Sequence, residues 1–277
     1  MDKKYSVLMS VYKNDRPDYL ISAIESMLKQ TIPPEQYVIV IDGPIPEELK
    51  VVIEQYQKNE ILFTVLELAE NGGLANALNH GLEVCRNELV ARMDADDISL
   101  PERCERELEF FAANPELVIC GCNIDEFYGS PDNVKTSRIV PSTYEEIKRF
   151  MRRRQAFNHP TVMYKKSKVL ECGGYSKFRR KEDFDLFSRM INLGCYVRNL
   201  NGSLYLYRVD QDNFKRRKSW DNFTSAIKVY LAHLKRKGCS VRDFIIISFA
   251  ELIFFIAPLR VVEWLSKMFL RKSNAVR

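Results

Sequence analysis

Three aspartates lie close together in the sequence, at Asp94, Asp96 and Asp97. They directly follow residues 88–93, a short run that predicts a strand of a buried sheet. Mg²⁺ and Mn²⁺ prefer oxygen ligands, and in proteins they take one or two carboxylates together with phosphate oxygens. One aspartate can instead cap the helix expected from about Pro101. Because a cap needs a single carboxylate, the cluster favours a site for Mn²⁺ or Mg²⁺, with Asp94 and Asp96 as candidate ligands.

Polar residues also follow three other predicted strands. They are Tyr12, which comes directly after Val11, then Asp42, and then the run Asn71-Gly72-Gly73. In a parallel sheet the carboxyl ends of the strands meet at one edge, and ligands bind beyond that edge. We therefore expect these residues to line one site together with the aspartate cluster.

Asp42 and the glycine run each allow two interpretations. Asp42 can accept hydrogen bonds from a base N–H or from ribose hydroxyls, or it can close an Asx turn before Gly43. The run at 71–73 can present backbone N–H groups to a phosphate or a sugar, or it can be an ordinary junction between a loop and a helix.

The second half of the chain contributes three more candidates. Asp183 begins an amphipathic helical pattern, so it is either a helix cap or a general base that accepts a proton from an acceptor hydroxyl. His159, in an Asn-His-Pro run, is either a third metal or phosphate contact or a structural loop histidine. The basic run at 215–218, which holds Arg216 and Arg217, either binds a diphosphate or forms a solvated face.

The elements that position these residues follow a repeated order along residues 1–120. Strands are predicted at residues 5–11, 37–41, 62–68 and 88–93, with amphipathic helices between them. Such a β-α-β-α order gives a mostly parallel sheet with helices on both faces, a Rossmann-like α/β fold. The second half is less regular, with helices predicted at 143–154, 166–172, 183–193 and 220–237 and strands at 161–164 and 203–208.

The composition is that of a folded protein. Of the 277 residues, 46% are hydrophobic and 29% are charged, which excludes disorder, and the 11 Gly and 11 Pro have no period, which excludes collagen-like repeats. The seven Cys are an odd number without metal-ligand spacing, so we expect a reducing compartment and neither a disulfide framework nor a structural zinc site. The first residues lack the apolar stretch of a secretory signal.

The net charge of +5 is unevenly distributed. Acidic side chains dominate residues 1–150 and basic ones residues 151–277, which suits phosphates or an anionic membrane, or reflects surface charge alone. Residues 244–257 are largely apolar but shorter than the about 20 residues that span a bilayer. This segment either packs on the domain or, with Trp264 and the cations around it, lies at a membrane interface. We expect the interfacial arrangement.

Seven short blocks of the sequence occur together in a characteristic order. They are SVLMSVY (6–12), VIDG (40–43), NGGLANALNHG (71–81), ARMDADD (91–97), NHP (158–160), GGY (173–175) and EDFDLFSR (182–189). In these blocks the chain resembles the family 2 glycosyltransferases, in particular bacterial members that serve exopolysaccharide, capsule and O-antigen assembly. The resemblance covers roughly residues 4–218.

The resemblance implies a GT-A fold and an inverting sugar transfer from a nucleotide-sugar, usually UDP-linked, with Mn²⁺ or Mg²⁺ as cofactor. It also implies that three parts of the chain have different roles. Residues 1–122 would bind the nucleotide-sugar, residues 123–218 would bind the acceptor and hold the catalytic base, and residues 219–277 would form a helical extension that associates with a membrane.

Each candidate residue takes a role from this resemblance. Asp183 would be the catalytic base and Asp96 the main metal ligand, while Asp94 would lie by the ribose and the metal. Asp42 would contact the nucleobase. The remaining candidates would line the nucleotide, the transferred sugar or the diphosphate: Val11, Tyr12, Asn71, Gly72, Gly73, Gly174, Glu182, Arg208, Arg216 and Arg217.

The sequence departs from the family pattern at two places. Asp42-Gly43-Pro44 stands where a double Asp with Gly-Ser is commoner, and no Q-x-x-R-W run follows, which implies single addition rather than processive synthesis. The expected partners are a UDP-sugar, a polyprenyl-diphosphate-linked glycan and an anionic membrane at the cytoplasmic face, and no nucleic acid. Two other functions stay open: a nucleotidyltransferase on a similar sheet, and a non-catalytic module that binds anions or membranes.

Overall fold

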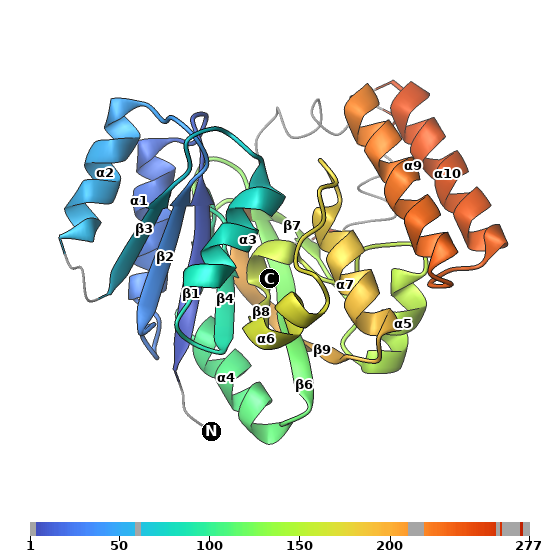
Figure 1. The fold of residues 1–277 in the computed structure, drawn as a ribbon, viewed down its shortest axis with the longest axis horizontal. Helices are drawn as coiled ribbons and strands as arrows, with labels where there is room; N and C mark the ends of the chain where they lie inside the picture. The colour runs from blue at the N-terminus through green and yellow to red at the C-terminus, as the bar shows by residue number, and fades with distance from the viewer. Residues whose placement is uncertain (1–3, 59–61, 210–218, 259–260, 262–271, 274–277) are drawn as a thin grey trace.

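The computed structural model describes residues 4–58, 62–209, 219–258, 261 and 272–273, which form a sheet with helices on both faces (Figure 1). The strands are β1 (Tyr5–Val11), β2 (Gln36–Ile41), β3 (Phe63–Glu67), β4 (Leu89–Met93), β5 (Ile98–Ser99), β6 (Leu117–Phe127), β7 (Val134–Arg138), β8 (Met163–Lys165), β9 (Tyr196–Arg208) and β10 (Lys272–Ser273). The helices are α1 (Pro17–Leu28), α2 (Glu47–Gln57), α3 (Leu74–Val84), α4 (Arg103–Ala113), α5 (Tyr144–Met151), α6 (Lys166–Glu171), α7 (Glu182–Asn192), α9 (Trp220–Lys235), α10 (Val241–Ile256) and the short 3-10 helix η1 (His159–Thr161).

The first half of the sheet is parallel, as predicted. β1 pairs with β2 on one side and with β4 on the other, and β2 pairs with β3, all in parallel register. Every residue of β2 and β4 is buried, which is typical of parallel strands covered on both faces. The carboxyl ends of these strands meet at one edge, where the chain continues into Tyr12, Asp42 and Asp94.

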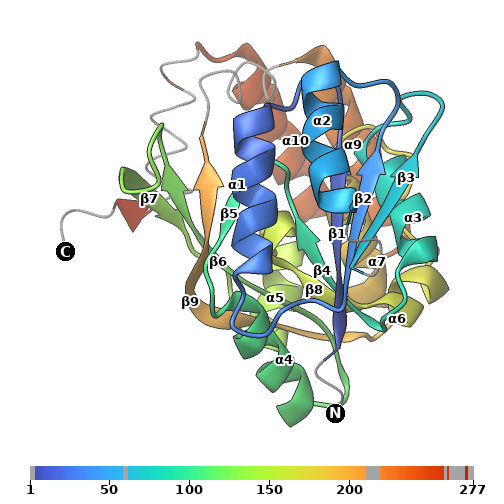
Figure 2. The ribbon, with the colours of Figure 1, turned by 90° about the vertical axis from the view of Figure 1, so that its left-hand side faces the viewer.

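Helices cover both faces of this half, and the side chains of β1 alternate between them. Val7 and Met9 face the core under α1 and α2, while Leu8 faces the core under α3; Figure 2 shows these helices on their two faces. α3 approaches the sheet closely because Gly81 has no side chain, and a Cβ there would overlap Leu8 and Val40. This packing sets the start of α3 beside the strand ends.

The second half of the sheet is built around β6, a long strand that the sequence analysis did not predict. β6 pairs antiparallel with β7 and β8 and parallel with β9, and β8 joins it to β4. The complete sheet is therefore mixed, with the predicted parallel order in β1–β4. β6 is buried along nearly all of LVICGCNIDEF, and its apolar part does not alternate, so periodicity alone does not separate strand from helix there.

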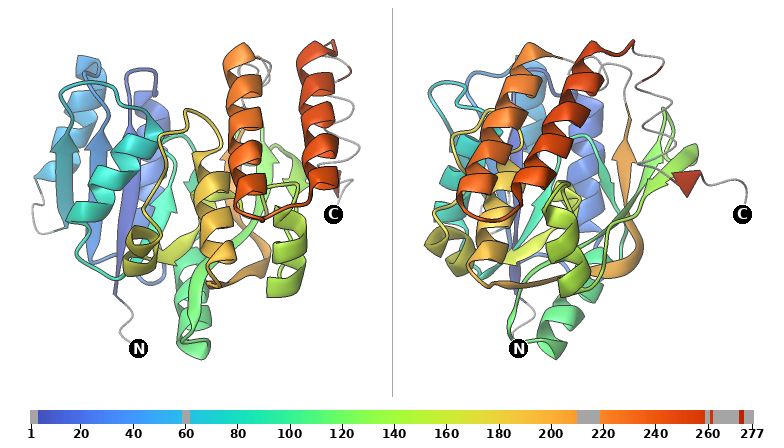
Figure 3. Two further views of the ribbon diagram at one scale, coloured as in Figure 1. Left: turned by 45° about the vertical axis from the view of Figure 1, so that its right-hand side comes forward. Right: turned by 90° about the vertical axis from the view of Figure 1, so that its right-hand side faces the viewer.

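Two antiparallel helices, α9 and α10, form the C-terminal part (Figure 3). α9 packs on α7, and α10 packs on α9. Ser240 and Asp243 form a capping box at the start of α10. Asp243 also pairs with Arg152 and Arg153 at 2.6 Å each, which ties α10 to the segment after α5. The helical extension is thus confirmed for α9 and α10.

α10 carries an exposed apolar face. Val241, Ile245, Phe249 and Ile256 are between 60% and 67% exposed. In the described ranges, no helix has the length and apolar character needed to cross a membrane. Trp264 and its neighbouring cations, part of the predicted interfacial segment, lie outside the described residues.

Candidate active site

The aspartate cluster forms the loop after β4, as predicted. One carboxylate oxygen from each of Asp94, Asp96 and Asp97 lies within 4.8 Å of the other two. Asp97 is buried, and its Oδ1 accepts a 2.7 Å hydrogen bond from the backbone N–H of Arg208 in β9. Asp96 is exposed and Asp94 is half-buried. Three oxygen donors at this spacing fit a divalent cation such as Mn²⁺ or Mg²⁺.

Desolvation and mutual repulsion disfavour three negative charges in this loop. Although the Asp96 side chain is exposed in part, desolvation by the surrounding protein and the neighbouring Asp94 carboxylate raise its pKa to about 6. Desolvation, with the charges of Asp96 and Asp94, raises the pKa of Asp97 well above its ordinary value. A cation between the carboxylates would relieve this repulsion and lower both pKa values. The electrostatics therefore agree with a cation site, and the geometry adds Asp97 to the two predicted ligands.

Two arginines flank the cluster. Arg92 is buried in β4 and pairs with Asp94. Arg208, predicted to contact a diphosphate, is also buried. Its Nε donates to the backbone carbonyl of Asp96 at 2.7 Å, and its guanidinium carbon lies 3.7 Å from the ring centre of Tyr19. Arg208 thus holds the loop that carries the cluster.

Asp42 holds the glycine loop (residues 71–73) in place. Its Oδ1 accepts a hydrogen bond from the Gly72 N–H at 2.8 Å, and its Oδ2 accepts bonds from the Gly73 N–H and the Asn71 side chain at 2.9 Å each. Gly43 allows this approach, because a Cβ there would lie 2.5 Å from the Asn71 backbone nitrogen. Both glycine N–H groups donate to Asp42 in this structure, which agrees with the alternative of a junction between a loop and a helix, and contacts of the loop with a nucleotide stay a prediction.

The end of β1 lies beside Asp42. The Val11 carbonyl accepts a 2.8 Å hydrogen bond from the Asp42 N–H. Tyr12 is half-buried, and its backbone N–H donates to Asp15 Oδ2 at 2.9 Å. Together with the glycine loop these residues form the predicted nucleotide side of the site, and their contacts with a nucleotide stay predictions. Two further residues predicted to bind the diphosphate lie outside the described part of the chain: Arg216 and Arg217.

Asp183 lies in the first turn of α7, at the other side of the site. Its Oδ2 accepts a 2.8 Å hydrogen bond from Gln155 Nε2, and its Oδ1 accepts a 2.7 Å bond from the Phe184 N–H. Desolvation and the Asp183 charge raise the pKa of the adjacent Glu182 to about 7. Asp183 is not the helix cap, because the N-cap residue of α7 is Lys181 and no side chain makes a capping bond there. The bond from Gln155, which comes from another element, orients the carboxylate as a base would require.

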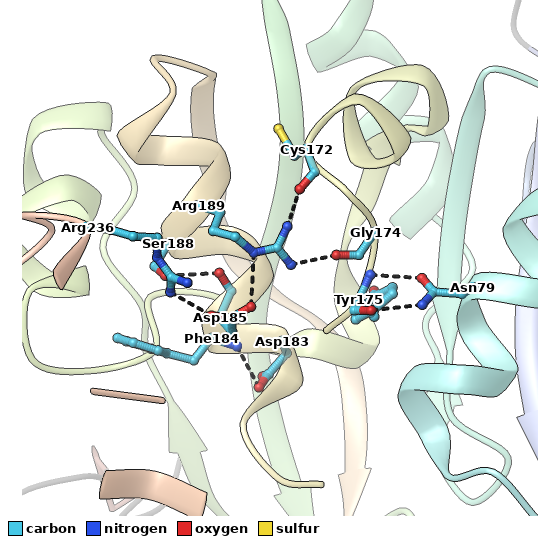
Figure 4. A network of polar contacts seen from close by, with 10 residues as sticks. All are labelled: Asn79, Cys172, Gly174, Tyr175, Asp183, Phe184, Asp185, Ser188, Arg189 and Arg236. Carbon is cyan, nitrogen blue, oxygen red and sulfur yellow. Dashed lines mark hydrogen bonds and ion pairs between the residues drawn. The ribbon is translucent and has the colours of Figure 1, made fainter. Parts of the chain in front are cut away.

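A polar network shapes the turn between α6 and α7 (Figure 4). Gly174 has a φ of 63°, and a Cβ there would lie 2.6 Å from Asn79 Oδ1, so glycine is required at this position. The Asn79 side chain binds both the N–H and the carbonyl of Tyr175 at 2.8 Å each, which ties the turn to α3. Arg189 donates to the carbonyls of Cys172 and Gly174.

Asp185 connects this network to α9. Its Oδ2 accepts a 2.9 Å bond from Arg189 Nε, and its Oδ1 accepts a 2.6 Å bond from Arg236 (Figure 4). Apart from Gly174, the sequence analysis gave no role to the residues of this network. Asp185 and Arg189 did carry a signal, because an acid and a base four residues apart on a predicted helix face each other. Asn79 lies in a block that carries the family resemblance, and Arg236 lies in none.

His159 does not join the carboxylate cluster. Its Nε2 lies 2.8 Å from the Tyr175 hydroxyl, and its ring packs edge-on against Phe187. Desolvation and the charge of Arg92 keep the pKa of His159 well below its usual range, so the ring is neutral. Among the described side chains, the group that meets the 4.8 Å spacing consists of the three aspartates alone. The structure therefore places His159 apart from the other predicted metal ligands.

A cavity of about 620 Å³ lies between the aspartate loop after β4 and the start of α7. Asp94, His159 and Asp183 line it, and side chains of α9 and α10 form its opposite wall. Asp94 of the carboxylate cluster and the candidate base thus face one space, as their predicted roles require. Asp42 does not line this cavity, so the predicted nucleotide side lies outside it, at the strand ends.

Comparisons with known sequences identify the family. A family model described as Glycosyl transferase family 2 matches residues 6–183. The amylovoran biosynthesis glycosyltransferase AmsE of Erwinia amylovora is 35% identical over 233 residues, which are 84% of this chain and 86% of AmsE. A UDP-Gal:alpha-D-GlcNAc-diphosphoundecaprenol beta-1,3-galactosyltransferase of Escherichia coli is 32% identical over 271 residues, 97% of each chain.

Solved structures share the fold. Residues 1–349 of TarS of S. aureus, in complex with UDP-GlcNAc, superpose with a TM-score of 0.66 at 16% identity, covering 93% of this chain and 74% of that chain. The mannosyltransferase PcManGT of Pyrobaculum calidifontis superposes with a TM-score of 0.62 at 15% identity, covering 96% of this chain and 75% of the PcManGT chain. The predicted GT-A fold is thereby confirmed, and a sugar transferase is favoured over a nucleotidyltransferase or a binding module. The chain belongs to glycosyl transferase family 2 and is a glycosyltransferase.

Proposed function

We propose that this glycosyltransferase is an inverting, metal-dependent enzyme that moves one sugar from a nucleotide-sugar to a hydroxyl of a lipid-linked glycan. One observation carries the proposal: Asp183 and Asp94, the first residue of the carboxylate cluster, face a single cavity. An inverting displacement needs a base for the incoming hydroxyl on one face of the sugar and charge stabilisation for the leaving diphosphate on the other. It needs no protein nucleophile.

Asp94, Asp96 and Asp97 are the residues that would hold the metal ion. Mn²⁺ or Mg²⁺ bound there would neutralise charge on the departing diphosphate. The raised pKa values of Asp96 and Asp97 support a bound cation, as does the fold neighbour PcManGT, whose structure is a complex with GDP-Man and Mn²⁺. His159 is left out of this ligand set, because its Nε2 is within hydrogen-bond distance of the Tyr175 hydroxyl.

Asp183 is the proposed base. Gln155 holds its Oδ2 at 2.8 Å, and the lone pairs that remain on the carboxylate can accept the proton of an acceptor hydroxyl. That hydroxyl oxygen then attacks the anomeric carbon as the bond to the diphosphate breaks, and the proton stays on Asp183 until it passes to solvent. A positioned base of this kind contributes roughly 10²–10⁴-fold to the rate.

A UDP-sugar is the proposed donor. The E. coli relative is named for UDP-Gal, and TarS was crystallised with UDP-GlcNAc. Asp42, Tyr12 and the glycine loop would contact the nucleotide, and Gly174 and Glu182 would lie near the transferred sugar. Since the Asp42 oxygens already accept three hydrogen bonds within the protein, only their remaining lone pairs can accept from a base or ribose.

A polyprenyl-diphosphate-linked glycan is the proposed acceptor, in cell-surface polysaccharide synthesis. The E. coli relative is named for a diphosphoundecaprenol acceptor. We further propose that the protein binds the inner, anionic face of the cell membrane through residues 219–277, which the exposed apolar face of α10 and the basic second half support. Deleting residues 241–277 is expected to release the protein from the membrane fraction. An unchanged membrane fraction would contradict this part of the proposal.

A product assay tests the transfer itself. The protein is incubated with UDP-sugars, Mn²⁺ and a lipid-diphosphate glycan, and the products are separated and identified. We expect UDP and a glycoside whose anomeric configuration is inverted by NMR, with loss of activity in EDTA. Release of pyrophosphate, retention of configuration, or full activity in EDTA would each overturn the corresponding part of the proposal.

A further inference from the structure

The cations of the cavity differ in their partners. The cations that line the cavity are Arg138, Arg153, Arg154 and Lys181. Lys181 pairs with Glu251 at 2.7 Å, and Arg153 pairs with Asp243 at 2.6 Å. Among the residues that the structure describes, Arg154 makes no ion pair. A positive charge is therefore available in the cavity.

Arg154 is connected to the proposed base through Gln155. The next residue in the chain is Gln155, whose side chain donates to Asp183, and all three residues line the cavity. The guanidinium carbon of Arg154 lies 5.0 Å from the ring centre of Phe150, which holds the side chain without neutralising it. Desolvation lowers the pKa of Arg154, and a bound anion would reverse that shift. The planar guanidinium matches the oxygens of a phosphate in a bidentate contact.

The part of the cavity wall that α10 forms is apolar except for Glu251, which pairs with Lys181. Ile246, Ile247, Ala250 and Phe254 of α10 face the cavity. The adjacent Ile245 does not line it and is 60% exposed on the other side of the helix. The cavity thus combines a carboxylate end, a cation beside it and an apolar wall across from both.

We propose that Arg154 and the cavity-facing side of α10 bind the phosphate and the first apolar carbons of a lipid-phosphate acceptor. This inference rests on the proposed transfer and assigns residues to its acceptor. A sugar whose hydroxyl lies at Asp183 would have its anomeric phosphate at Arg154 and its lipid along Ile246, Ala250 and Phe254. The volume of about 620 Å³ is within the usual range of small-molecule sites.

Binding of a short prenyl diphosphate to the full chain tests the site without any transfer. Farnesyl diphosphate, farnesol and inorganic pyrophosphate are titrated by calorimetry in EDTA, so that no metal at the carboxylate cluster binds the diphosphate. We expect farnesyl diphosphate to bind at least about tenfold more tightly than either of the other two, because only it engages both the cation and the apolar wall. Equal affinity for pyrophosphate would point to a free-phosphate site and overturn the proposal.

Two pairs of variants separate the cation from the apolar wall. Arg154→Ala is expected to weaken farnesyl diphosphate binding by about 10-fold to 100-fold and to leave farnesol unchanged, with partial recovery in Arg154→Lys. Arg149→Ala, the same change on an exposed arginine of α5 outside this cavity, should have no effect. Ile246→Ser is expected to weaken both prenyl ligands, and Ile245→Ser neither. Equal effects within either pair would overturn the proposal.

The same variants distinguish a failure of this site from a failure of the proposed function. If the product assay detects no sugar transfer, the proposed function fails, while the metal-free titrations still report on the site. If transfer occurs, Arg154→Ala should raise the KM of a lipid-phosphate acceptor about tenfold or more and leave the KM of the UDP-sugar unchanged. A fall in kcat alone would mean that Arg154 acts elsewhere in the reaction and would overturn the assignment.

Discussion

The nucleotide side and the acceptor side of the site are built in different ways. On the nucleotide side, the N–H groups of the glycine loop donate hydrogen bonds to the Asp42 carboxylate. Asp42 is only 3% exposed. On the acceptor side, Asp183 lies in α7 and Arg154 in the segment after α5. Both line the cavity, and side chains of α10 form part of its wall. The nucleotide side is thus fixed by hydrogen bonds between loops that follow neighbouring strands, whereas the acceptor side depends on how helices and loops pack around a cavity.

This difference implies different responses to substitution. A change on the acceptor side should alter turnover with little effect on folding, because its charged groups make few contacts inside the protein. A change at Asp42 should alter stability first, because it leaves buried donors without an acceptor. A change in the aspartate cluster should alter metal binding.

The largest effect is expected from Asp183→Asn. The amide cannot accept the acceptor proton, so kcat should fall by roughly 10²–10⁴-fold, while Mn²⁺-dependent UDP binding stays unchanged. Single-turnover transfer and UDP titration measure the two quantities. Asp132→Asn, at an exposed surface carboxylate, is the matched control and should retain full activity. Turnover within tenfold of the parent protein would remove Asp183 as the base.

Asp96→Asn should reduce transfer by about 10²–10³-fold, the range seen when one charge-stabilising group is removed from a site. Unlike the change at Asp183, this one should also weaken Mn²⁺-dependent UDP binding. Titration of UDP at several Mn²⁺ concentrations distinguishes the two variants. An unchanged Mn²⁺ requirement would exclude Asp96 as a ligand. The variants at Asp96 and Asp183 would then no longer differ in their effect on metal-dependent UDP binding.

Asp42→Ala should destabilise the protein by about 1–3 kcal/mol, because the N–H groups of Gly72 and Gly73 lose their acceptor. Denaturant unfolding measures this loss. Asp183→Asn keeps the shape of its side chain and should change stability much less. A larger loss at Asp183 than at Asp42 would reverse the comparison between the two sides.

The stabilising effect of Mn²⁺ should depend on pH. The pKa of Asp96 is raised to about 6, so its carboxylate is protonated below that pH and charged above it. Metal binding requires the charged form, and affinity should fall as pH drops through 6. Without metal, a raised folded-state pKa costs stability as pH increases from about 4 toward 6. The Mn²⁺-induced rise in Tm should therefore be larger at pH 7 than at pH 5, and Asp96→Asn should remove that difference.

The smallest effect is expected from Arg236→Ala. Asp185 would keep its bond to Arg189 and lose only the contact with α9, a change of about 1 kcal/mol in unfolding free energy. Lys235→Ala, an exposed neighbour, is the control. Thermal unfolding and the KM of the acceptor are measured for both. A rise in acceptor KM specific to Arg236→Ala would show that α9 helps to position the acceptor side.

The two sides also differ in how far the sequence predicts them. The strands before Asp42 and Asp94 are apolar runs between helices. The alternation of strands and helices predicts a parallel sheet, and therefore predicts that the polar residues after these strands lie at one edge. β6 was not predicted, because its buried apolar run through Cys120, Gly121 and Cys122 does not alternate. Without β6, the packing of the second half and the cavity itself could not be derived.

Individual contacts at the site were harder to predict than its location. Asp42 sits where the sequence analysis expected it, but its partners are the loop N–H groups, a choice that depends on the approach allowed at Gly43. Gln155 and Arg154 belong to no motif, and they reach the site only because α5 packs near α7. Long-range packing of this kind leaves no pattern in the local sequence.

The central claim is that the carboxylate cluster and Asp183 act on one sugar from the same cavity. Its most direct test is the NMR relaxation of the protons of a bound acceptor glycan in the presence of UDP and Mn²⁺. We expect strong paramagnetic enhancement in the parent protein, the same enhancement in Asp183→Asn, and none in Asp96→Asn. An acceptor that binds with no enhancement by Mn²⁺ would place it in a different part of the molecule and contradict the claim.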